Sequence, residues 1–437
     1  MTRIALLALA GLLAGYSAGR SQTPPPSSAD TCRTTVPADS GLTLRDLLLE
    51  VRARHPALEA ARARVRAARG NRSWARAIDN PTFGVQLENV RVPGKPSVPM
   101  DRETMYTAML PLENIYQRGP RVRQAGAELA AASADTSALV LQLFLDAAHA
   151  YYRTALVQLE LETATDLAGW LDSVAAYNRL RAKEGLAAEA DLLRSELERD
   201  RMTADAAMRA ADLAGVRAVL AEFLPQVRAS PRIAVPAEPL GMPETPALGG
   251  SLPRVEALRQ RLRAMDAAVA AERSMLIPQL GFMVGAKESA GRTSLLGGLS
   301  LPLPLLNRNG GRITRARGER DAVAFELARE ERAARAALAA ATESSRRLSV
   351  EATALGAKTA DGGSAYLARA EEVRRIALGA YREGAVPLIT VVDAARAWGD
   401  ARITYYQLLF AQHEAVLAHF AARGIDPLEA LAGGTRP

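Results

Sequence analysis

The chain has one cysteine and four histidines among 437 residues, and aromatic residues make up only 5% of it. A single cysteine excludes an internal disulfide. With so few and such dispersed histidines, we expect no dedicated metal site, and no cofactor-binding motif is present. The low aromatic content, together with abundant alanine and arginine, favours long helices that pack closely through small residues over ordinary globular domains.

The first residues are typical of a secretory signal, which we assign to residues 1–19. Arg3 supplies the positive start, and the apolar run that follows is too short to cross a bilayer, which requires about twenty residues. Tyr16 stands where a bacterial lipoprotein carries its acylated cysteine, so we predict no lipid anchor. Residues 20–41, which are rich in Pro, Ser and Thr and contain Cys32, are expected to be disordered. No later stretch reads as a membrane-spanning helix, so strands are expected to cross any membrane.

A long internal repeat organises the rest of the chain. The pentapeptide RVRQA at 121–125 recurs as RITRA at 312–316, an offset of 312 − 121 = 191, and Gly185 recurs as Gly384, an offset of 384 − 185 = 199. A period this long indicates a duplicated half-molecule rather than a solenoid. We therefore assign a first repeat at 42–224, a connector at 225–251, a second repeat at 252–424 and a tail at 425–437. The Pro- and Gly-rich connector is either a flexible linker or an irregular belt packed on the helices.

Each repeat contains two stretches of about ten residues that alternate between apolar and polar or small residues. We predict strands at 82–90, 103–112, 279–287 and 293–303. This length and alternation are typical of membrane-spanning β-strands. The side chains expected to face lipid are Phe83, Val85, Leu87, Phe282 and Leu299.

Four such strands cannot close on themselves. Left open in lipid, their two edges would expose unpaired backbone groups at several kcal/mol each, which together exceed any folding stability. Closure therefore requires further copies of the chain, and three copies would supply an even number of strands.

The remaining sequence predicts very long helical hairpins, at 117–223 and 307–422. A heptad seam of alanine, leucine and other small or apolar residues runs through the first hairpin, which indicates coiled-coil packing. At about 1.5 Å per residue, a helix over 117–182 is roughly 100 Å long. The net charge is +7, but the arginines are interspersed with glutamates along these helices, so we interpret them as a solvated face and expect no nucleic-acid partner.

No motif points to an enzyme. The GxSxG pattern at 15–19 lies within the signal, and His413-Glu414 lacks the second histidine of a zinc-protease helix, because Leu417 stands there. We therefore predict a protein without catalytic activity.

Several motifs together resemble the TolC-type outer-membrane efflux proteins. They are Asn80-Pro81 before the first strand, the run LPLE at 110–113 leading into RGPR at 118–121, and the run SLPLPLLNRNGG at 300–311. The last run is similar to the branch that serves cobalt–zinc–cadmium and copper–silver pumps. The resemblance covers the chain from about Leu42 onward.

The resemblance implies a fold class and partners. The chain would be mainly α with a transmembrane β-barrel: a homotrimer whose twelve-stranded barrel crosses the outer membrane and continues as an α-helical tunnel in the periplasm. The partners would be outer-membrane lipid, a periplasmic membrane-fusion adaptor and a proton-driven inner-membrane RND-type pump. The cargo would be heavy-metal cations, selected by the pump rather than by the channel.

In that family, glycine-centred hairpin tips contact the adaptor and gate the entrance. Carried over to this chain, the adaptor-contact residues are Gly185, Leu186, Gly384 and Val386. The entrance-gating residues are Asp393 and Asp191. Thr390 departs from the family pattern, because a second carboxylate often stands at that position.

Two other functions are compatible with the sequence. A channel for multidrug efflux or type I protein secretion would use the same tunnel. A periplasmic coiled-coil scaffold would need the helices alone, and it predicts a protein that requires no detergent.

Overall fold

A computed structural model describes residues 41–90, 101–111, 114–186, 188–224, 232–241, 252–277, 280–301, 307–358, 363–428 and 431. The predicted signal, with Tyr16, and the segment that contains Cys32 lie outside these residues, as do parts of the connector and tail.

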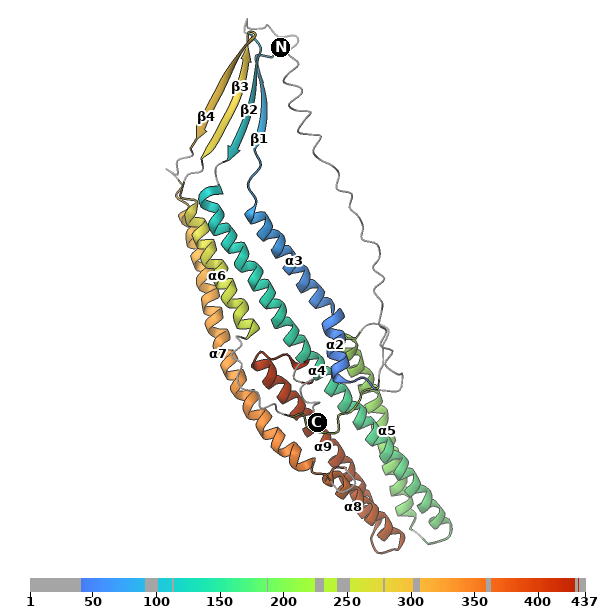
Figure 1. Ribbon diagram of the computed structural model, residues 1–437. Coiled ribbons are helices and arrows are strands. Elements are labelled where there is room, and N and C mark those ends of the chain that lie inside the picture. Colours follow the sequence, from blue (N-terminus) through green and yellow to red (C-terminus); the bar gives the residue numbers. More distant parts are fainter. Residues whose placement is uncertain are drawn as a thin grey trace, which may run out of the picture. The chain divides into compact units, whose positions relative to one another are not determined.

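Helices dominate both halves. The first half comprises α2 (Leu44–Arg54), α3 (Pro56–Arg76), β1 (Thr82–Glu88), β2 (Glu103–Pro111), α4 (Asn114–Lys183) and α5 (Glu189–Ala221). The second comprises α6 (Pro253–Ser274), β3 (Gly281–Ser289), β4 (Arg292–Ser300), α7 (Gly310–Leu355), α8 (Ala365–Arg382) and α9 (Leu388–Ala422). Figure 1 shows the four strands together beyond one end of the helices and the two hairpin turns at the other end.

The strand boundaries differ from those predicted by one to three residues. The first strand ends at Glu88, because Asn89 adopts a positive φ of 56° that turns the chain. The third strand runs to Ser289 rather than 287, and the fourth runs Arg292–Ser300 instead of 293–303. Between them, Ala290 and Gly291 have φ values of 49° and 74°, as a tight two-residue hairpin turn requires.

The strands form one antiparallel sheet in the order β1-β2-β3-β4, so β1 and β4 are its two edges. Directly paired residues share a face, and the register pairs Phe83 with Ala108, Val85 with Tyr106 and Phe282 with Leu299. All five residues predicted to face lipid therefore lie on one face of the sheet. They are also highly exposed in the single chain, from 48% for Leu87 and Phe282 to 79% for Phe83.

The opposite face of the sheet is mixed, since it holds Met105, Met283 and Leu296 beside small and polar residues. It carries Gln86 and Glu88 of β1, Glu103 of β2 and Lys287 of β3, and Lys287 forms an ion pair with Glu103. Ser289 donates a hydrogen bond to Glu103 at 2.9 Å. The sheet thus separates an apolar face from a face with paired charges.

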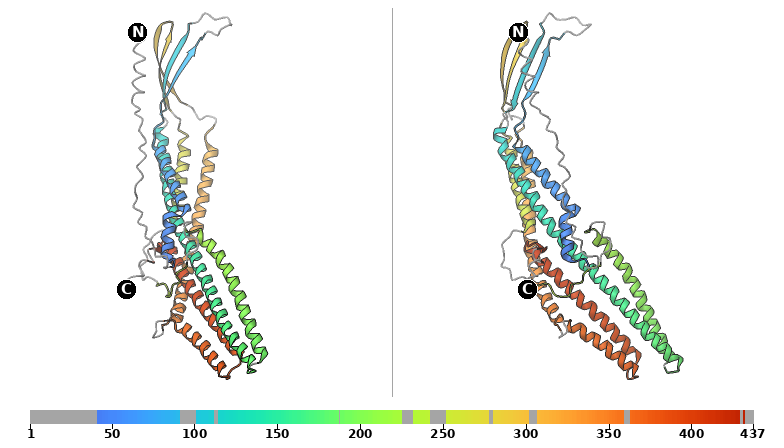
Figure 2. Two further views of the ribbon diagram at one scale, coloured as in Figure 1. Left: turned by 90° about the vertical axis from the view of Figure 1, so that its right-hand side faces the viewer. Right: turned by 45° about the vertical axis from the view of Figure 1, so that its right-hand side comes forward.

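The helices lie side by side in a layer of four lanes, as contacts between them show. α4 contacts α3 and α5 on one flank and α6 and α9 on the other, and α7 in turn contacts α6 and α9. Three lanes are therefore each shared by a pair of helices, α3 with α5, α6 with α9 and α7 with α8, whereas α4 fills its lane alone (Figure 2). This arrangement follows the duplication.

Residues 232–241 of the connector form a belt packed on α4 and α9. The motif Tyr-Tyr-x5-Gln occurs at 151–158 in α4 and at 405–412 in α9. Each glutamine holds one belt residue at both backbone groups: Gln158 accepts from Ile233 N at 3.1 Å, and Gln412 accepts from Leu240 N at 3.0 Å and donates to its carbonyl at 2.7 Å. Of the two interpretations of the connector, this described part is a belt.

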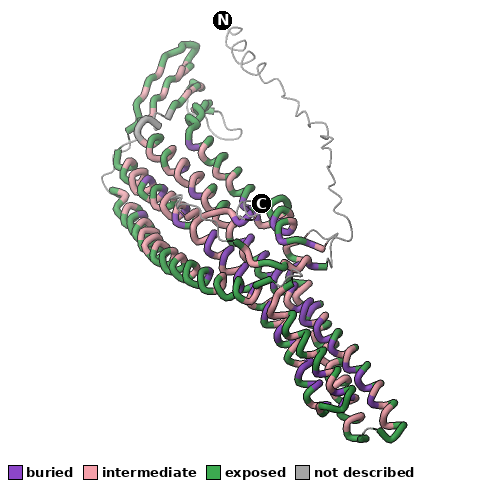
Figure 3. Tube along the Cα trace, turned by 60° about the horizontal axis from the view of Figure 1, so that its bottom comes forward, coloured by how far each residue is buried: buried purple, intermediate pink, exposed green. Residues whose placement is uncertain are grey.

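The largest buried cluster lies beneath the belt. It includes Leu47 and Leu48 of α2, Phe144 and Tyr152 of α4 and Leu409 of α9. In Figure 3 the buried residues gather along the helices, whereas the strands show only intermediate and exposed positions. The helical part therefore has its own core, and the sheet has none within this single chain.

One expectation about membrane helices is wrong. By length and composition alone, the Gln117–Lys183 part of α4 is long and apolar enough to cross a membrane. Its many alanines and leucines raise the mean hydropathy. A helix that packs against α3, α5, α6 and α9 can have this composition without lying in a bilayer.

Candidate functional site: the two hairpin tips

Both predicted tip glycines lie where two long helices reverse direction. Gly185 and Gly384 have φ values of 73° and 79°, a conformation that a residue with a Cβ atom adopts only at a cost. In both turns the glycine N–H bonds three residues back and the next N–H bonds five residues back: Leu186 N reaches Arg181 O at 2.8 Å, and Ala385 N reaches Ala380 O at 2.8 Å. These paired bonds cap α4 and α8 identically.

The two tips differ in what they expose. Leu186 is 62% exposed, an unusual position for a large apolar side chain. Val386 is only partly exposed, because it packs against a cluster formed by Leu171 and Val174 of α4 and Leu388 of α9, among others. The first tip therefore exposes a large apolar side chain, whereas the valine of the second tip packs within the chain.

The two candidate gating carboxylates also differ. Asp393 lies on α9 and is exposed, and it forms no hydrogen bond or ion pair with any described residue. Asp191 lies in the first turn of α5, where the helix dipole favours a negative charge, and it is half-buried. Only Asp393 has a fully solvated carboxylate that several copies could bring together.

A buried hydrogen bond joins the two hairpins, and sequence reasoning missed it. The Tyr381 hydroxyl on α8 donates to Asn178 Oδ1 on α4 at 2.7 Å, and both side chains are buried. Burial raises the pKa of Tyr381, and the negative charge of Asp191 raises it further. Nothing in the residue spacing identifies this pair, although Tyr381 stands three residues before the tip glycine.

Further from the tips, charges and rings connect the same helices. Arg396 on α9 forms an ion pair with Glu198 on α5 at 2.6 Å. The guanidinium of Arg374 on α8 lies 4.5 Å from the ring centroid of Trp398 on α9 and 5.5 Å from that of Trp170 on α4. Such cation–π contacts are worth about 0.5–2 kcal/mol each, so they stabilise the pairing of the hairpins.

No group of three or more metal-ligating His, Cys, Asp or Glu side chains occurs in the described part of the chain. His413 is buried, where its Nε2 donates to Glu238 O at 2.9 Å and its Nδ1 accepts from the Tyr152 hydroxyl at 2.9 Å. Both ring nitrogens therefore make structural hydrogen bonds, and burial lowers the pKa of His413.

The comparisons with known proteins agree with this architecture. The model of the outer membrane efflux protein family matches residues 47–198, which confirms the resemblance to this family for the part of the chain that holds the motifs at 80–81, 110–113 and 118–121. None of the curated proteins matches the sequence.

Several solved structures share the fold. The outer membrane protein VceC from Vibrio cholerae is 19% identical, with a TM-score of 0.70 over 87% of this chain and 96% of that one. The outer membrane channel CmeC from Campylobacter jejuni is 12% identical, with a TM-score of 0.72 over 87% and 85%. CusC, whose structures describe transmembrane channel formation, is 18% identical, with a TM-score of 0.68 over 87% and 92%. Residues 47–198 thus carry the sequence of an outer membrane efflux protein, in a chain whose fold matches solved outer-membrane channels over most of its length.

Proposed function

We propose that this protein is the outer-membrane channel of a tripartite efflux system, a passive exit duct without enzymatic activity. The sheet lies in the outer membrane, and the helices form a tunnel in the periplasm. The observation that carries this proposal is the register, which brings every predicted lipid-facing side chain to one exposed face while paired charges lie on the other. A soluble four-stranded sheet would bury one of its faces.

The functional unit is a homotrimer. β1 and β4 are edge strands without a further strand partner in the described chain, and each unpaired backbone group costs several kcal/mol in lipid. Three copies bring twelve strands, so that β4 of one copy can pair with β1 of the next. The four-lane helical layers of the same copies would then continue the barrel as a tunnel.

Two neighbouring positions on β1 test the membrane assignment. Val85 lies on the apolar face and Gln86 on the polar face. Val85→Lys is expected to destabilise membrane insertion by about 2–4 kcal/mol, whereas Gln86→Lys should assemble normally and lower cation selectivity. Detergent extraction from outer membranes, native mass spectrometry for the trimer and single-channel recording in planar bilayers measure these effects. Equal assembly of both variants, or a wild-type protein that is monomeric in plain buffer, contradicts the proposal.

The hairpin tips dock a periplasmic adaptor, which links the channel to an inner-membrane, proton-driven RND-type pump. Leu186 at the first tip and the turn around Gly384 and Val386 at the second supply the contacts. Leu186→Asp is expected to abolish the resistance of cells to the exported substrate, while the purified trimer conducts ions as the wild type does. Leu197→Asp is the matched control, because Leu197 is also an exposed leucine but lies within α5. Unchanged resistance in the Leu186 variant would show that docking takes place elsewhere.

Asp393 and Asp191 line the entrance and favour cations. A three-fold axis would gather three Asp393 carboxylates, whose repulsion favours opening and whose charge attracts cations. Asp393→Asn should therefore reduce cation selectivity in planar bilayers, and Asp191→Asn, at a half-buried carboxylate, should change it less. Identical conductance and selectivity in the Asp393 variant would refute this role.

The cargo we propose is heavy-metal cations, in keeping with the resemblance of the run at 300–311. A host that lacks its own channel, supplied with this protein and its cognate pump and adaptor, should gain tolerance to cobalt, zinc or cadmium salts. Tolerance to organic compounds alone would assign the duct to multidrug efflux instead.

A further inference from the structure

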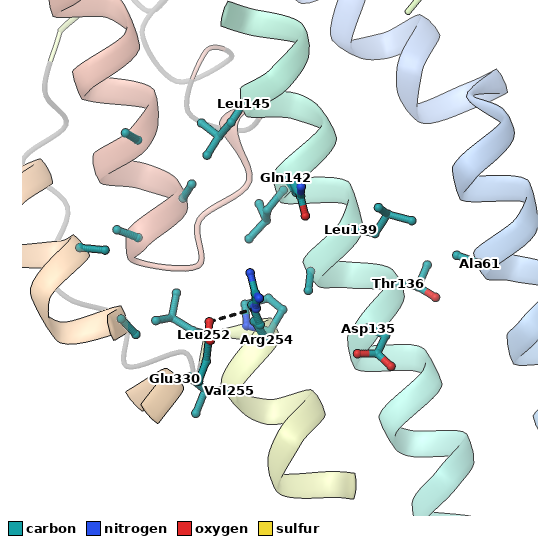
Figure 4. Close-up of a pocket in the computed structure, with 18 of the residues that line it drawn as sticks. Ala61, Asp135, Thr136, Leu139, Gln142, Leu145, Leu252, Arg254, Val255 and Glu330 are labelled. Carbon is teal, nitrogen blue, oxygen red and sulfur yellow. Dashed lines mark ion pairs between the residues drawn. The ribbon is translucent and has the colours of Figure 1, made fainter. Parts of the chain in front are cut away.

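A cavity of about 920 Å³ lies in the helical layer, away from the hairpin tips and from the sheet. It is bordered by α3, α4, α6, α7 and α9, and Figure 4 shows side chains from these elements, including Ala61 of α3, drawn around it. Its volume is in the range of pockets that hold drug-sized molecules. Nothing in the proposed transport function requires a cavity at this place.

The cavity exists because two helices meet end to end in one lane. α9 ends in a glycine-capped turn at Gly424, whose position lies within van der Waals distance of Pro253 at the start of α6. The equivalent junction in the first half lies between α5 and α3. There the Phe223 ring packs against the His55 ring, with 5.8 Å between their centroids.

In the second half, the residues at the corresponding positions are smaller or aliphatic. Phe223 corresponds to Ala422, because 422 − 223 = 199 is the offset of the two tip glycines. His55, immediately before the proline that begins α3, corresponds to Leu252 before the proline that begins α6. Ala422 and Leu252 both line the cavity. The second junction therefore lacks the pair of rings that meets at the first.

Most of the lining is apolar. The larger apolar side chains are Leu139, Leu141, Leu145, Leu252 and Val255. Nine alanines also line the cavity: Ala61 on α3, and Ala132, Ala138, Ala334, Ala337, Ala341, Ala418, Ala421 and Ala422 on α4, α7 and α9. A cavity lined in this way accepts the hydrophobic body of a ligand and gains about 25 cal/mol for each Å² of apolar surface that it buries.

The polar part of the lining is asymmetric in charge. Two ion pairs cross the cavity wall, Arg254 with Glu330 at 3.0 Å and Arg261 with Asp135 at 2.6 Å. Arg64 also lines the cavity and has no ion-pair or hydrogen-bond partner among the described residues. The Gln142 amide likewise forms no side-chain hydrogen bond there. One unpaired cation and one free amide therefore remain for a ligand.

We propose that this cavity binds an amphipathic organic anion, with its apolar body among the leucines and alanines and its carboxylate at Arg64. A guanidinium recognises a carboxylate through two parallel hydrogen bonds, and Gln142 can donate a further one. The occupant would stand at the α6–α9 junction, where Phe223 stands in the first half. All of the residues that line the site belong to a single chain.

Photoaffinity labelling of the purified full-length protein tests the proposal. The probe is 4-[3-(trifluoromethyl)diazirin-3-yl]benzoic acid, and the corresponding benzylamine is the charge-reversed control. We expect the carboxylate to label residues 132–145 and 330–341 saturably, at a concentration about tenfold lower than the amine requires. Equal labelling by the two probes, or carboxylate adducts spread over the chain, overturns the proposal.

Two variants separate the apolar body from the charge. Ala422→Phe restores the aromatic ring of the first half and should abolish labelling at both segments. Arg64→Gln should weaken labelling about tenfold, the value of one charge-assisted contact. Arg69→Gln, another exposed arginine of α3 outside the cavity, is the control and should leave labelling unchanged. Circular dichroism confirms that each variant is folded, and unchanged labelling in a folded Ala422 variant refutes the site.

Discussion

Replacing Tyr381 by phenylalanine removes one oxygen atom from the contact between the two hairpins. The hydroxyl donates to Asn178 Oδ1 at 2.7 Å in a buried position, while the Asn178 Nδ2 atom already lacks a hydrogen-bond partner. The variant therefore leaves both polar atoms of the Asn178 side chain without a protein partner. The aromatic packing of Tyr381 against Leu388 and Val391 stays intact.

The magnitude follows from the hydrogen bond. Such a bond contributes about 0.5–1.5 kcal/mol, and a buried acceptor left unpaired costs about 1–3 kcal/mol unless water reaches it. Separating the hairpins would let water in, so the variant favours separation by at least about 1 kcal/mol per chain. If three chains open together, about 3 kcal/mol shifts the equilibrium roughly 150-fold toward the open channel.

Single-channel recording in planar bilayers measures this shift as the fraction of time in the high-conductance state. Tyr177→Phe is the matched control, because the Tyr177 ring contacts Tyr381 edge-on at 6.4 Å but its hydroxyl forms no hydrogen bond within the described residues. We expect Tyr381→Phe to increase open time and Tyr177→Phe to leave it unchanged. Equal open times for the wild type and the Tyr381 variant would falsify the assignment of this bond to the closed state.

Three further changes have defined outcomes. Gly384→Val, at a φ of 79°, should cost about 1–2 kcal/mol locally and abolish resistance in cells while native mass spectrometry still detects the trimer. Gln412→Leu removes the two hydrogen bonds to the belt and one to Ser349, so thermal unfolding should show a loss of about 2–4 kcal/mol. Burial lowers the pKa of His413 below its ordinary value of 6.5, so the folded chain binds fewer protons than the unfolded one. Stability should therefore be complete above about pH 6.5 and fall as the pH drops below it, with a smaller slope in His413→Gln.

The sequence was most informative where physical periodicity is strong. Alternation at Phe83, Val85 and Leu87 predicted that these side chains share one face of β1, and the register of the sheet confirms it. The repeated glycines identified both tips, because a helix that reverses direction needs a residue tolerant of positive φ. These features depend on local chemistry, which a single sequence records directly.

Contacts between distant segments were not predictable in the same way. Asn178 and Tyr381 are separated by 203 positions, and neither residue type implies the other. The sequence of the connector is compatible with a flexible linker and with a packed belt. Only the fold shows that Gln158 and Gln412 form hydrogen bonds with its backbone. The α6–α9 cavity depends on comparing Phe223 with Ala422, and that comparison has meaning only once the two junctions are known to be equivalent.

The two halves of the duplication also differ in how they can move. α4 runs without interruption from Asn114 to Lys183, whereas its counterpart is divided into α7 and α8. The division lies level with the belt, where Lys358 forms an ion pair with Glu238 at 2.6 Å. A continuous helix moves as one body, but a divided one can bend at the break. The Tyr381 bond joins α8, which follows the break, to the continuous helix α4, so we expect its loss to let α8 move away from α4.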